Sequence, residues 1–455
     1  MTIMYLSDLT EMSSVSLEKF ILAYNSESRN PLVKAFIADQ VKNPETFNVE
    51  IYANDDGINH ILNAYHCDVN RSLLEYLQSG KDIVDRLREV VNWKFNGFEN
   101  VISFLDFACG SGRLTRFLLQ ELPVARITVS DIKDDAVAFQ EKTFGVRGIL
   151  SVSIPEDYPE ENQYDCILIS SLFSHLPEKT FSRWLKKLYN LLLPNGVLIF
   201  TVNDVSTMPL GMQMIDSGIV FAEVSEIKSL SLQDYGTTWV TESFVRQLID
   251  DISGGKASYY RMSRGLWNQD LYVLANTPNE DFSGLRVGPI KGCLDTCFFQ
   301  TPDRLILSGW AVDTKPEGEI ESILVSINGQ VMESCILQYE RPDVASFLQD
   351  EKFLISGWSC SFSLPESTVL CDDIMMVKAI NKQKIEHLIY LGLIGSTLTY
   401  AEAEQIELIE SPGSIEKLSE TEIEQSEISL FEKLVYPARR VLHIYRQWRA
   451  RRNGS

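Results

Sequence analysis

The sequence has 455 residues, which is too long for one hydrophobic core, so two or three domains are expected. Its 41 Lys and Arg against 63 Asp and Glu give a net charge of −22, and no basic patch with interleaved aromatic residues appears in the central region. This combination disfavours nucleic-acid partners. The eight cysteines form neither a CxxC pair nor a Cys/His cluster, so no metal site is expected.

The first residues lack the cationic stretch of a signal peptide, and no apolar run approaches the roughly 18 residues that a membrane span needs. A reduced, cytoplasmic location is therefore expected. Residues 1–94 are expected to form a mainly helical segment that covers a cofactor. Its clearest amphipathic stretches are residues 16–23 and 72–93, and a turn is expected at residues 54–57.

Residues 101–118 combine an apolar strand, a turn of small residues and the start of a helix. The strand ends at Asp106, and Gly110 and Gly112 lie in the turn. Such a turn points backbone N–H groups and a helix N-terminus at a ligand. A dinucleotide fingerprint would need a third glycine where Thr115 stands, so NAD is disfavoured.

Further strands alternate with helices after this turn. Apolar strands alternating with amphipathic helices indicate an α/β fold with a mostly parallel, doubly wound sheet that is covered on both faces. The predicted strands are residues 127–131, 148–152, 164–177, 196–202, 258–267 and 270–274, and helices are expected at 177–193 and from Thr241, the latter on the spacing of Phe244, Leu248 and Ile252.

An insertion, residues 203–238, separates the fifth strand from the last helix and the final strand pair. It is long for a connection within such a sheet, so we interpret it as a candidate substrate lid.

The segment from Asp106 to Gly112 resembles motif I of the class I S-adenosylmethionine-dependent methyltransferases, [DE]-x-G-x-G-x-G, with Ala108 in place of the first glycine. The order and spacing of the later strands are also similar to this family. The resemblance implies a seven-stranded Rossmann-like domain at residues 95–278 and S-adenosyl-L-methionine as cofactor. Alanine at position 108 matters only if its φ is positive.

The resemblance also implies which residues hold the cofactor. Asp131, at the tip of the second strand, would accept hydrogen bonds from the ribose hydroxyls. Tyr76 would belong to the covering helix, although a plain packing role for that helix is equally open. The full set of expected cofactor-binding residues is Tyr76, Asp106, Ala108, Cys109, Gly110, Gly112, Asp131, Ile132, Ser153, Ser170 and Ser171.

Two residues are candidates for a catalytic base. His175 follows the fourth strand at the edge of the sheet where ligands bind, and Asp204 follows the fifth strand. In many members of the methyltransferase family that the sequence resembles, a histidine at the position of His175 lines the pocket without acting as a base. Cys109 and Cys166 are expected to be small buried residues of the sheet.

The residue pattern changes in residues 285–396 to short segments in which apolar and polar residues alternate, which predicts an antiparallel β-sandwich. Ser-Gly-Trp occurs twice, at Trp310 and Trp358, and these rings are expected to be core anchors rather than sugar platforms. A hairpin turn is expected at Asn328-Gly329. The segment resembles accessory β-domains of bacterial enzymes of surface-glycan assembly.

The last two segments have opposite charge. Residues 397–428 are acidic and predict a flexible linker. Residues 429–455 are basic, with apolar positions at helical spacing, and predict an amphipathic helix. Two partners stay open for this helix, namely an anionic membrane surface, which would place the protein at the periphery of the inner membrane, and a protein surface.

The leading hypothesis is a methyltransferase that acts on a small molecule or on a sugar or glycan precursor. The alternatives are a methyltransferase of protein or lipid acceptors and a non-catalytic scaffold that binds the cofactor.

Overall fold

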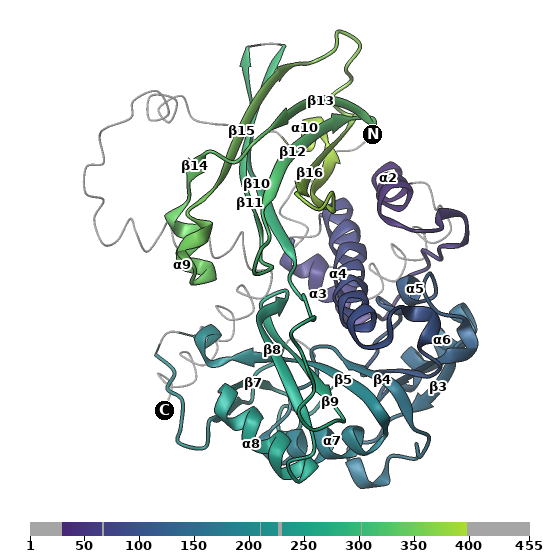
Figure 1. Ribbon diagram of the computed structural model, residues 1–455. Helices are drawn as coiled ribbons and strands as arrows, with labels where there is room; N and C mark the ends of the chain where they lie inside the picture. The colour runs from purple at the N-terminus through teal and green to yellow at the C-terminus, as the bar shows by residue number, and fades with distance from the viewer. Residues whose placement is uncertain (1–29, 66–67, 210, 226–229, 302, 398–455) are drawn as a thin grey trace, which may run out of the picture. The chain divides into compact units, whose positions relative to one another are not determined.

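The computed structural model describes residues 30–65, 68–209, 211–225, 230–301 and 303–397 (Figure 1). Predictions for residues 16–23 and for the linker and basic helix after residue 397 therefore lie outside the described residues. The chain divides between Leu285 and Arg286 into two compact units. Among the described residues, no helix is both long enough and apolar enough to cross a bilayer.

In the described part of the first unit, the α-helices before the sheet are α2 (Pro31–Gln40), α3 (Asp56–Ala64) and α4 (Val69–Phe95). α4 contains the predicted amphipathic stretch and is longer at both ends. The prediction of a turn at residues 54–57 is wrong for Asp56 and Gly57, which are the first residues of α3. The Asp55 carboxylate accepts hydrogen bonds from the N–H groups of Gly57 and Ile58, and this cap starts α3 one residue later.

The first unit is built on a mostly parallel sheet with the strand order β3-β2-β1-β4-β5-β9-β8. β9 pairs antiparallel with both β5 and β8, so the final strand pair predicted from the sequence is confirmed. Its strands are β1 (Phe104–Phe107), β2 (Ile127–Asp131), β3 (Arg147–Leu150), β4 (Tyr164–Ile169), β5 (Leu192–Asp204), β8 (Ser258–Leu266) and β9 (Gln269–Ala275).

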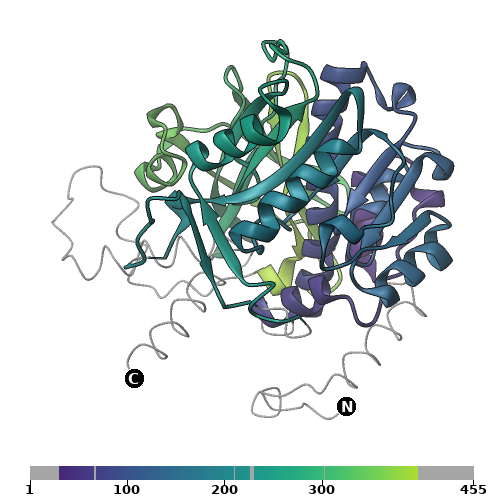
Figure 2. The same ribbon diagram turned by 90° about the horizontal axis from the view of Figure 1, so that it is seen from below.

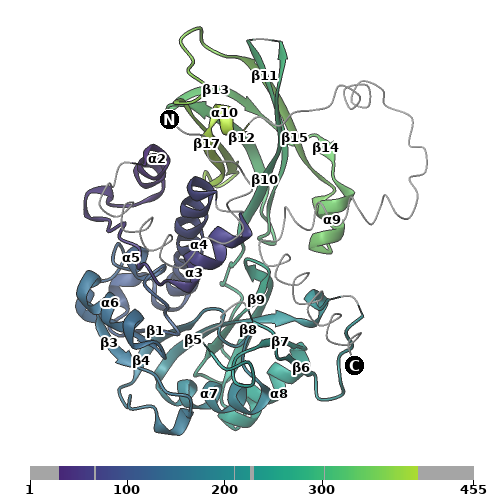
Figure 3. The same ribbon diagram turned by 180° about the vertical axis from the view of Figure 1, so that it is seen from behind.

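Helices cover both faces of this sheet. α7 (Glu178–Asn190) and α8 (Glu242–Ser253) lie on one side and α4 lies on the other (Figures 1 and 3). α6 (Asp134–Phe144) packs on β2 and β3. The helix predicted after the glycine turn is present as α5 (Thr115–Leu118), which has only four residues.

The insertion adds a two-stranded ribbon to the end of β5. In Figure 2, β5 is the long teal arrow. β7 (Thr237–Val240) pairs in parallel with the last two residues of β5 and antiparallel with β6 (Ile219–Ala222). The ribbon has its own apolar cluster, formed by Met208, Met212, Met214, Ala222, Val224 and Trp239.

The second unit contains two four-stranded antiparallel sheets whose apolar faces form one core, in agreement with the predicted sandwich. One sheet has the order β10-β11-β15-β14 and the other β13-β12-β16-β17. Their strands are β10 (Ile290–Thr301), β11 (Arg304–Asp313), β12 (Ile320–Ile327), β13 (Gln330–Cys335), β14 (Tyr339–Glu340), β15 (Ile355–Ser363), β16 (Ile374–Asn381) and β17 (Glu386–Leu393), and two short helices are α9 (Pro342–Leu348) and α10 (Ile394–Thr397).

The two Ser-Gly-Trp copies lie on neighbouring strands and pair with each other. Gly309 on β11 is opposite Trp358 on β15, and Trp310 is opposite Gly357. Trp310 and Trp358 are 3% and 1% exposed, so both are core anchors, as predicted. The hairpin predicted at Asn328-Gly329 is also confirmed, because both residues have the positive φ that a type I′ turn requires.

Candidate functional site

The glycine turn that follows β1 has a strained backbone. Ala108, Gly110 and Gly112 have φ values of 59°, 56° and 89°. Ala108 therefore occupies the left-handed region that costs an L-residue about 1–2 kcal/mol. The replacement of the first motif glycine by alanine thus carries strain in this protein.

Two glycines of the turn have different surroundings. A Cβ on Gly112 would lie 2.3 Å from the Phe144 ring, so this position needs glycine for packing as well as for φ. A Cβ on Gly110 would meet no atom within 4 Å. Gly110 is also exposed, so its backbone faces open space at the edge of the sheet.

Asp131, at the end of β2, holds this turn from one side. Its Oδ2 accepts a hydrogen bond from the Gly110 N–H (2.9 Å) and its Oδ1 accepts one from the Lys133 N–H (3.0 Å). Burial raises the pKa of Asp131, and these backbone donors oppose the shift. The neighbouring Ile132 is 42% exposed and offers an apolar surface beside the carboxylate.

Asp106, on β1, is buried with an Oδ2 atom that has no hydrogen-bond partner among the described residues. Burial, and then the charge of Asp131, raise the pKa of Asp106 to about 8, while Arg113 opposes the shift. The Ser170 hydroxyl, at the end of the adjacent β4, is a second buried polar group without a partner in the described part of the chain. Buried polar atoms of this kind mark a place where a ligand can supply the missing partner.

Two buried side chains that the sequence did not single out support the turn. Gln140 on α6 is 0% exposed and donates to the Gly110 carbonyl. Arg116 is 1% exposed and donates to the carbonyls of Gly112, Asn48 and Glu50. Gln140 is a polar residue on the buried face of α6, a helix that the sequence analysis did not predict. Two of the three partners of Arg116 lie 68 and 66 residues away and leave no local signal.

Tyr76 has a different position from that expected of a cofactor cover. Its ring is fully buried on α4, its hydroxyl donates to Asp55 (2.6 Å), and the Arg116 guanidinium lies 5.4 Å from the ring centroid. It therefore supports the turn through Arg116 and presents no free surface. α4 itself lies directly against the turn, because a Cβ on Gly80 would be 2.3 Å from the Arg113 carbonyl.

The predicted cofactor residues after β3 and β4 lie at the same edge of the sheet. Ser171 has a φ of 60°, its N–H donates to Thr201, and its hydroxyl accepts from Gln269. Ser153 lies in a bend beyond β3 and is followed by Ile154, which is 49% exposed. Cys109 and Cys166 are buried, as predicted, and burial raises the pKa of both thiols.

His175 is 2% exposed and is held by the insertion. Its Nδ1 lies 2.7 Å from the Gly236 carbonyl oxygen, which can only accept, so Nδ1 carries the proton. The Gly236 N–H donates to the His175 carbonyl, and the Tyr235 ring stacks on the imidazole with a centroid distance of 4.4 Å. This burial disfavours direct contact between His175 and an acceptor.

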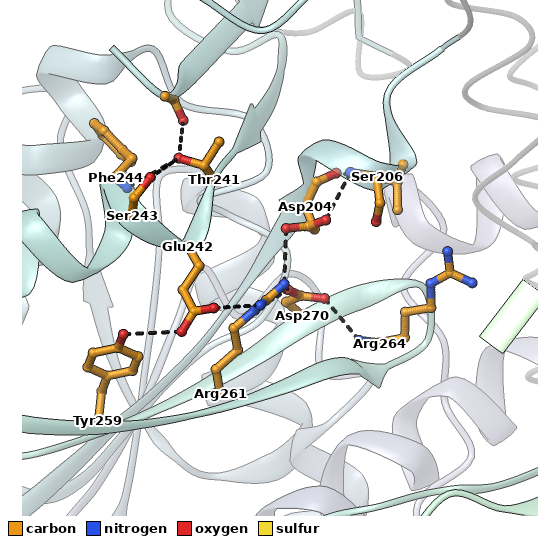
Figure 4. Close-up of polar contacts among 12 residues, drawn as sticks. Asp204, Ser206, Thr241, Glu242, Ser243, Phe244, Tyr259, Arg261, Arg264 and Asp270 are labelled. Carbon is orange, nitrogen blue, oxygen red and sulfur yellow. Dashed lines mark hydrogen bonds and ion pairs between the residues drawn. The ribbon is translucent and has the colours of Figure 1, made fainter. Parts of the chain in front are cut away.

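Asp204 belongs to an ion-pair cluster that Figure 4 shows. Its Oδ1 accepts from the Ser206 N–H, and its Oδ2 pairs with Arg261 (3.1 Å). Arg261 also contacts Asp270, the second residue of β9, and Glu242, the first residue of α8 (both 2.7 Å). Both oxygens of Asp204 are therefore engaged in tying the insertion to the sheet, and we do not assign it as a base.

α4, which lies against the turn at Gly80, also carries the acidic residues Glu75 and Asp82. Glu75 and Asp82 are carboxylic acids whose pKa values are raised by burial, and burial and then Asp82 raise the pKa of Glu75 to about 7. Arg113 lowers the pKa of both Glu75 and Asp106. No group of residues in the described ranges has the composition of a metal site.

Residues 105–198 match the model of a family described as a methyltransferase domain. The chain is 32% identical over 107 residues to malonyl-[acyl-carrier protein] O-methyltransferase of Priestia megaterium (strain DSM 319 / IMG 1521), covering 23% of this chain and 38% of that protein. It is 25% identical over 161 residues to N-terminal Xaa-Pro-Lys N-methyltransferase 1 of Rattus norvegicus, covering 32% of this chain and 67% of that protein. The chain thus spans between about a third and two thirds of these relatives.

Among solved structures, the chain is similar to the plantazolicin methyltransferase BamL in complex with a triazolic desmethylPZN analog and SAH. The identity is 13% and the TM-score 0.35, with 58% of this chain and 100% of that chain covered. A DhpI–SAH complex has 14% identity and a TM-score of 0.32, with 50% and 97% covered.

Proposed function

Since this chain carries a class I S-adenosylmethionine-dependent methyltransferase domain, we propose that it transfers the methyl group of that cofactor to a small polar acceptor, such as a sugar or glycan precursor. The observation that carries the proposal is the edge formed by the glycine turn. There, the exposed backbone of Gly110 lies beside the buried carboxyl groups of Asp106 and Asp131, and Asp106 has an oxygen without a partner in the described part of the chain.

The residues at this edge fit the cofactor. Asp131 would accept hydrogen bonds from the ribose diol, Ile132 would provide an apolar surface for the adenine, and Asp106 would face the cationic amino acid part. Gly110 would leave room for close approach, because no atom lies where a Cβ would be. Bound S-adenosylmethionine supplies a methyl group on a sulfonium, which is its own leaving group.

The protein then has two tasks, to align the acceptor atom in line with the methyl–sulfur bond and to exclude water. An alcohol must also lose its proton, which goes to a base. Glu75 is a candidate for this role: burial raises the pKa of its carboxyl group to about 7, and its Oε2 accepts a hydrogen bond from the Tyr65 hydroxyl (3.4 Å). With Asp82 and Gln78 it gives α4 a polar surface that favours an acceptor bearing hydroxyl groups.

A second candidate is a methyltransferase of protein or acyl-carrier acceptors, because the named relatives include an N-terminal protein methyltransferase and a malonyl-[acyl-carrier protein] methyltransferase. Turnover of sugar and glycan precursors, of N-terminal peptides and of acyl thioesters, each with methyl-labelled cofactor, separates the two candidates.

The cofactor assignment is tested by calorimetric titration with S-adenosylmethionine. Asp131→Ala should weaken binding by about 1.5–3 kcal/mol, the range for a hydrogen-bond partner that carries charge. A wild-type protein that binds no cofactor would overturn the proposal, and unchanged affinity in the variant would overturn the role of Asp131.

A further inference from the structure

Gln140 is the one side chain of α6 that reaches the glycine turn with hydrogen bonds among the described residues. Its Nε2 donates to the Gly110 carbonyl (2.8 Å) and lies 3.0 Å from Cys109 Sγ, and its Oε1 accepts from the Thr115 hydroxyl (2.5 Å). The side chain is fully buried, so water cannot replace these partners when it is removed.

Gly110 is therefore fixed at both of its backbone polar groups. Its N–H donates to Asp131 on β2, and its carbonyl accepts from Gln140 on α6. The turn needs this support, because three of its five residues from Ala108 to Gly112 have positive φ. Strained conformations of this kind persist only where their surroundings hold them.

We propose that Gln140 is a positioning residue for the cofactor, which acts through the backbone of Gly110, across its φ and ψ, on the Asp131 carboxylate. The inference rests on the proposed function. The Gly110 carbonyl and the Gly110 N–H belong to the two successive peptide planes on either side of its Cα. The Gln140 bond fixes the second plane and thereby limits rotation of the first, whose N–H donates to Asp131 Oδ2. Without Gln140 the backbone of Gly110 can rotate about φ and ψ, and Asp131 then loses the Gly110 N–H, one of its two backbone donors, while it keeps the Lys133 N–H.

The experiment compares Gln140→Leu with Thr115→Val in the full chain. Both substitutions remove a hydrogen bond from the same buried cluster, but only the first removes the bond to the turn. Gln140→Leu should weaken binding of S-adenosylmethionine and S-adenosylhomocysteine at least tenfold in calorimetric titrations, and Thr115→Val by less than threefold. Gln120→Leu, the same change at a half-buried residue whose amide bonds to Asn43 and Thr46 rather than to the turn, is the matched control and should leave affinity unchanged.

A double-variant cycle tests the route through Asp131. In an Asp131→Ala background, Gln140→Leu should reduce affinity by less than twofold, because the carboxylate that it positions is gone. Equal losses from Gln140→Leu and Thr115→Val, or a loss from Gln140→Leu that is as large in the Asp131→Ala background, would overturn the proposal and leave Gln140 a general packing residue.

A readout without cofactor keeps this inference separate from the proposed function and from a folding failure. Hydrogen exchange of the peptide that contains Gly110 should be faster in Gln140→Leu than in Thr115→Val, while exchange in β4 and β5 stays as in the wild type. Unchanged exchange at Gly110 would overturn the inference even if the wild type binds cofactor, and faster exchange in β4 and β5 would show a loss of fold that contradicts a local role.

Discussion

At the scale of single residues, the site combines strain with buried charge. Ala108 holds a conformation that glycine adopts without cost, and Asp106 keeps a carboxyl group in a place that disfavours its ionisation. Both features can be measured separately from catalysis, because one acts on stability and the other on proton binding.

Ala108→Gly should raise the free energy of unfolding by up to about 1 kcal/mol, because relief of the left-handed alanine exceeds the entropy that glycine adds to the unfolded chain. Urea unfolding measures this difference. Ala138→Gly is the matched control, because Ala138 is an exposed residue within α6 and the same change there should cost about 1 kcal/mol. Destabilisation by Ala108→Gly would contradict the strain.

The raised pKa of Asp106 predicts a pH dependence of cofactor affinity. Below pH 8 the free protein keeps Asp106 protonated, and a cation bound beside it favours the carboxylate, so binding releases a proton. Affinity should fall up to tenfold for each pH unit below 8. Calorimetry in buffers of different ionisation enthalpy counts the protons, and Asp106→Asn should abolish the dependence. A wild-type affinity that is flat between pH 6 and 9 would contradict the assignment.

The same shift affects stability with a defined sign. The folded state retains the Asp106 proton up to about pH 8, whereas an unfolded aspartate loses it near its usual value of 3.8. Raising the pH through this window therefore lowers the contribution of Asp106 to the free energy of unfolding.

At the scale of elements, the predictions from the sequence are right for strands and helices that a local residue pattern determines. The bounds of β2 agree with the prediction to the residue, and α8 was predicted although the residues that it buries most are Val245 and Ile249, beside the expected stripe. Asp106, Gly110 and Gly112 could also be identified from the sequence, because they belong to one local motif. Gln140 and Arg116 were not predicted, because their partners are set by how helices pack after folding.

The insertion is the element whose contacts say most about His175. His175 and Gly236 exchange two hydrogen bonds, and Thr238 adds bonds to the carbonyls of Ser174 and Leu176. The imidazole thus belongs to the attachment between the insertion and the segment after β4.

His175→Ala should therefore lower the free energy of unfolding by about 1–3 kcal/mol, as for a buried hydrogen-bond partner, and reduce turnover by less than tenfold. Urea unfolding and the pH profile of kcat measure the two effects. A loss of at least a hundredfold in kcat, together with removal of the acidic limb, would instead identify His175 as the base.

At the scale of the whole molecule, charge is distributed unevenly along the chain. Residues 429–455 contain seven Lys and Arg and one Glu, a charge of 7 − 1 = +6, and residues 401–428 contain one Lys and nine Glu, 1 − 9 = −8. If the basic segment binds a membrane, each cation near the surface contributes about 1 kcal/mol.

Removal of residues 429–455 should leave cofactor binding unchanged and abolish binding to anionic vesicles, which sedimentation measures. Neutral vesicles are the control, and added salt should weaken the attraction, because screening acts over about 8 Å at physiological ionic strength. A full chain that ignores anionic vesicles at low salt would indicate that the segment contacts protein.

The contacts of Arg116 have a practical consequence for where this protein can be cut. The family match begins at residue 105, but the Arg116 guanidinium finds two of its three acceptors in Asn48 and Glu50. A clone that starts at the family boundary would leave a buried cation without these acceptors. A fragment that keeps these contacts must therefore begin before residue 48, well upstream of residue 105, where the family match begins.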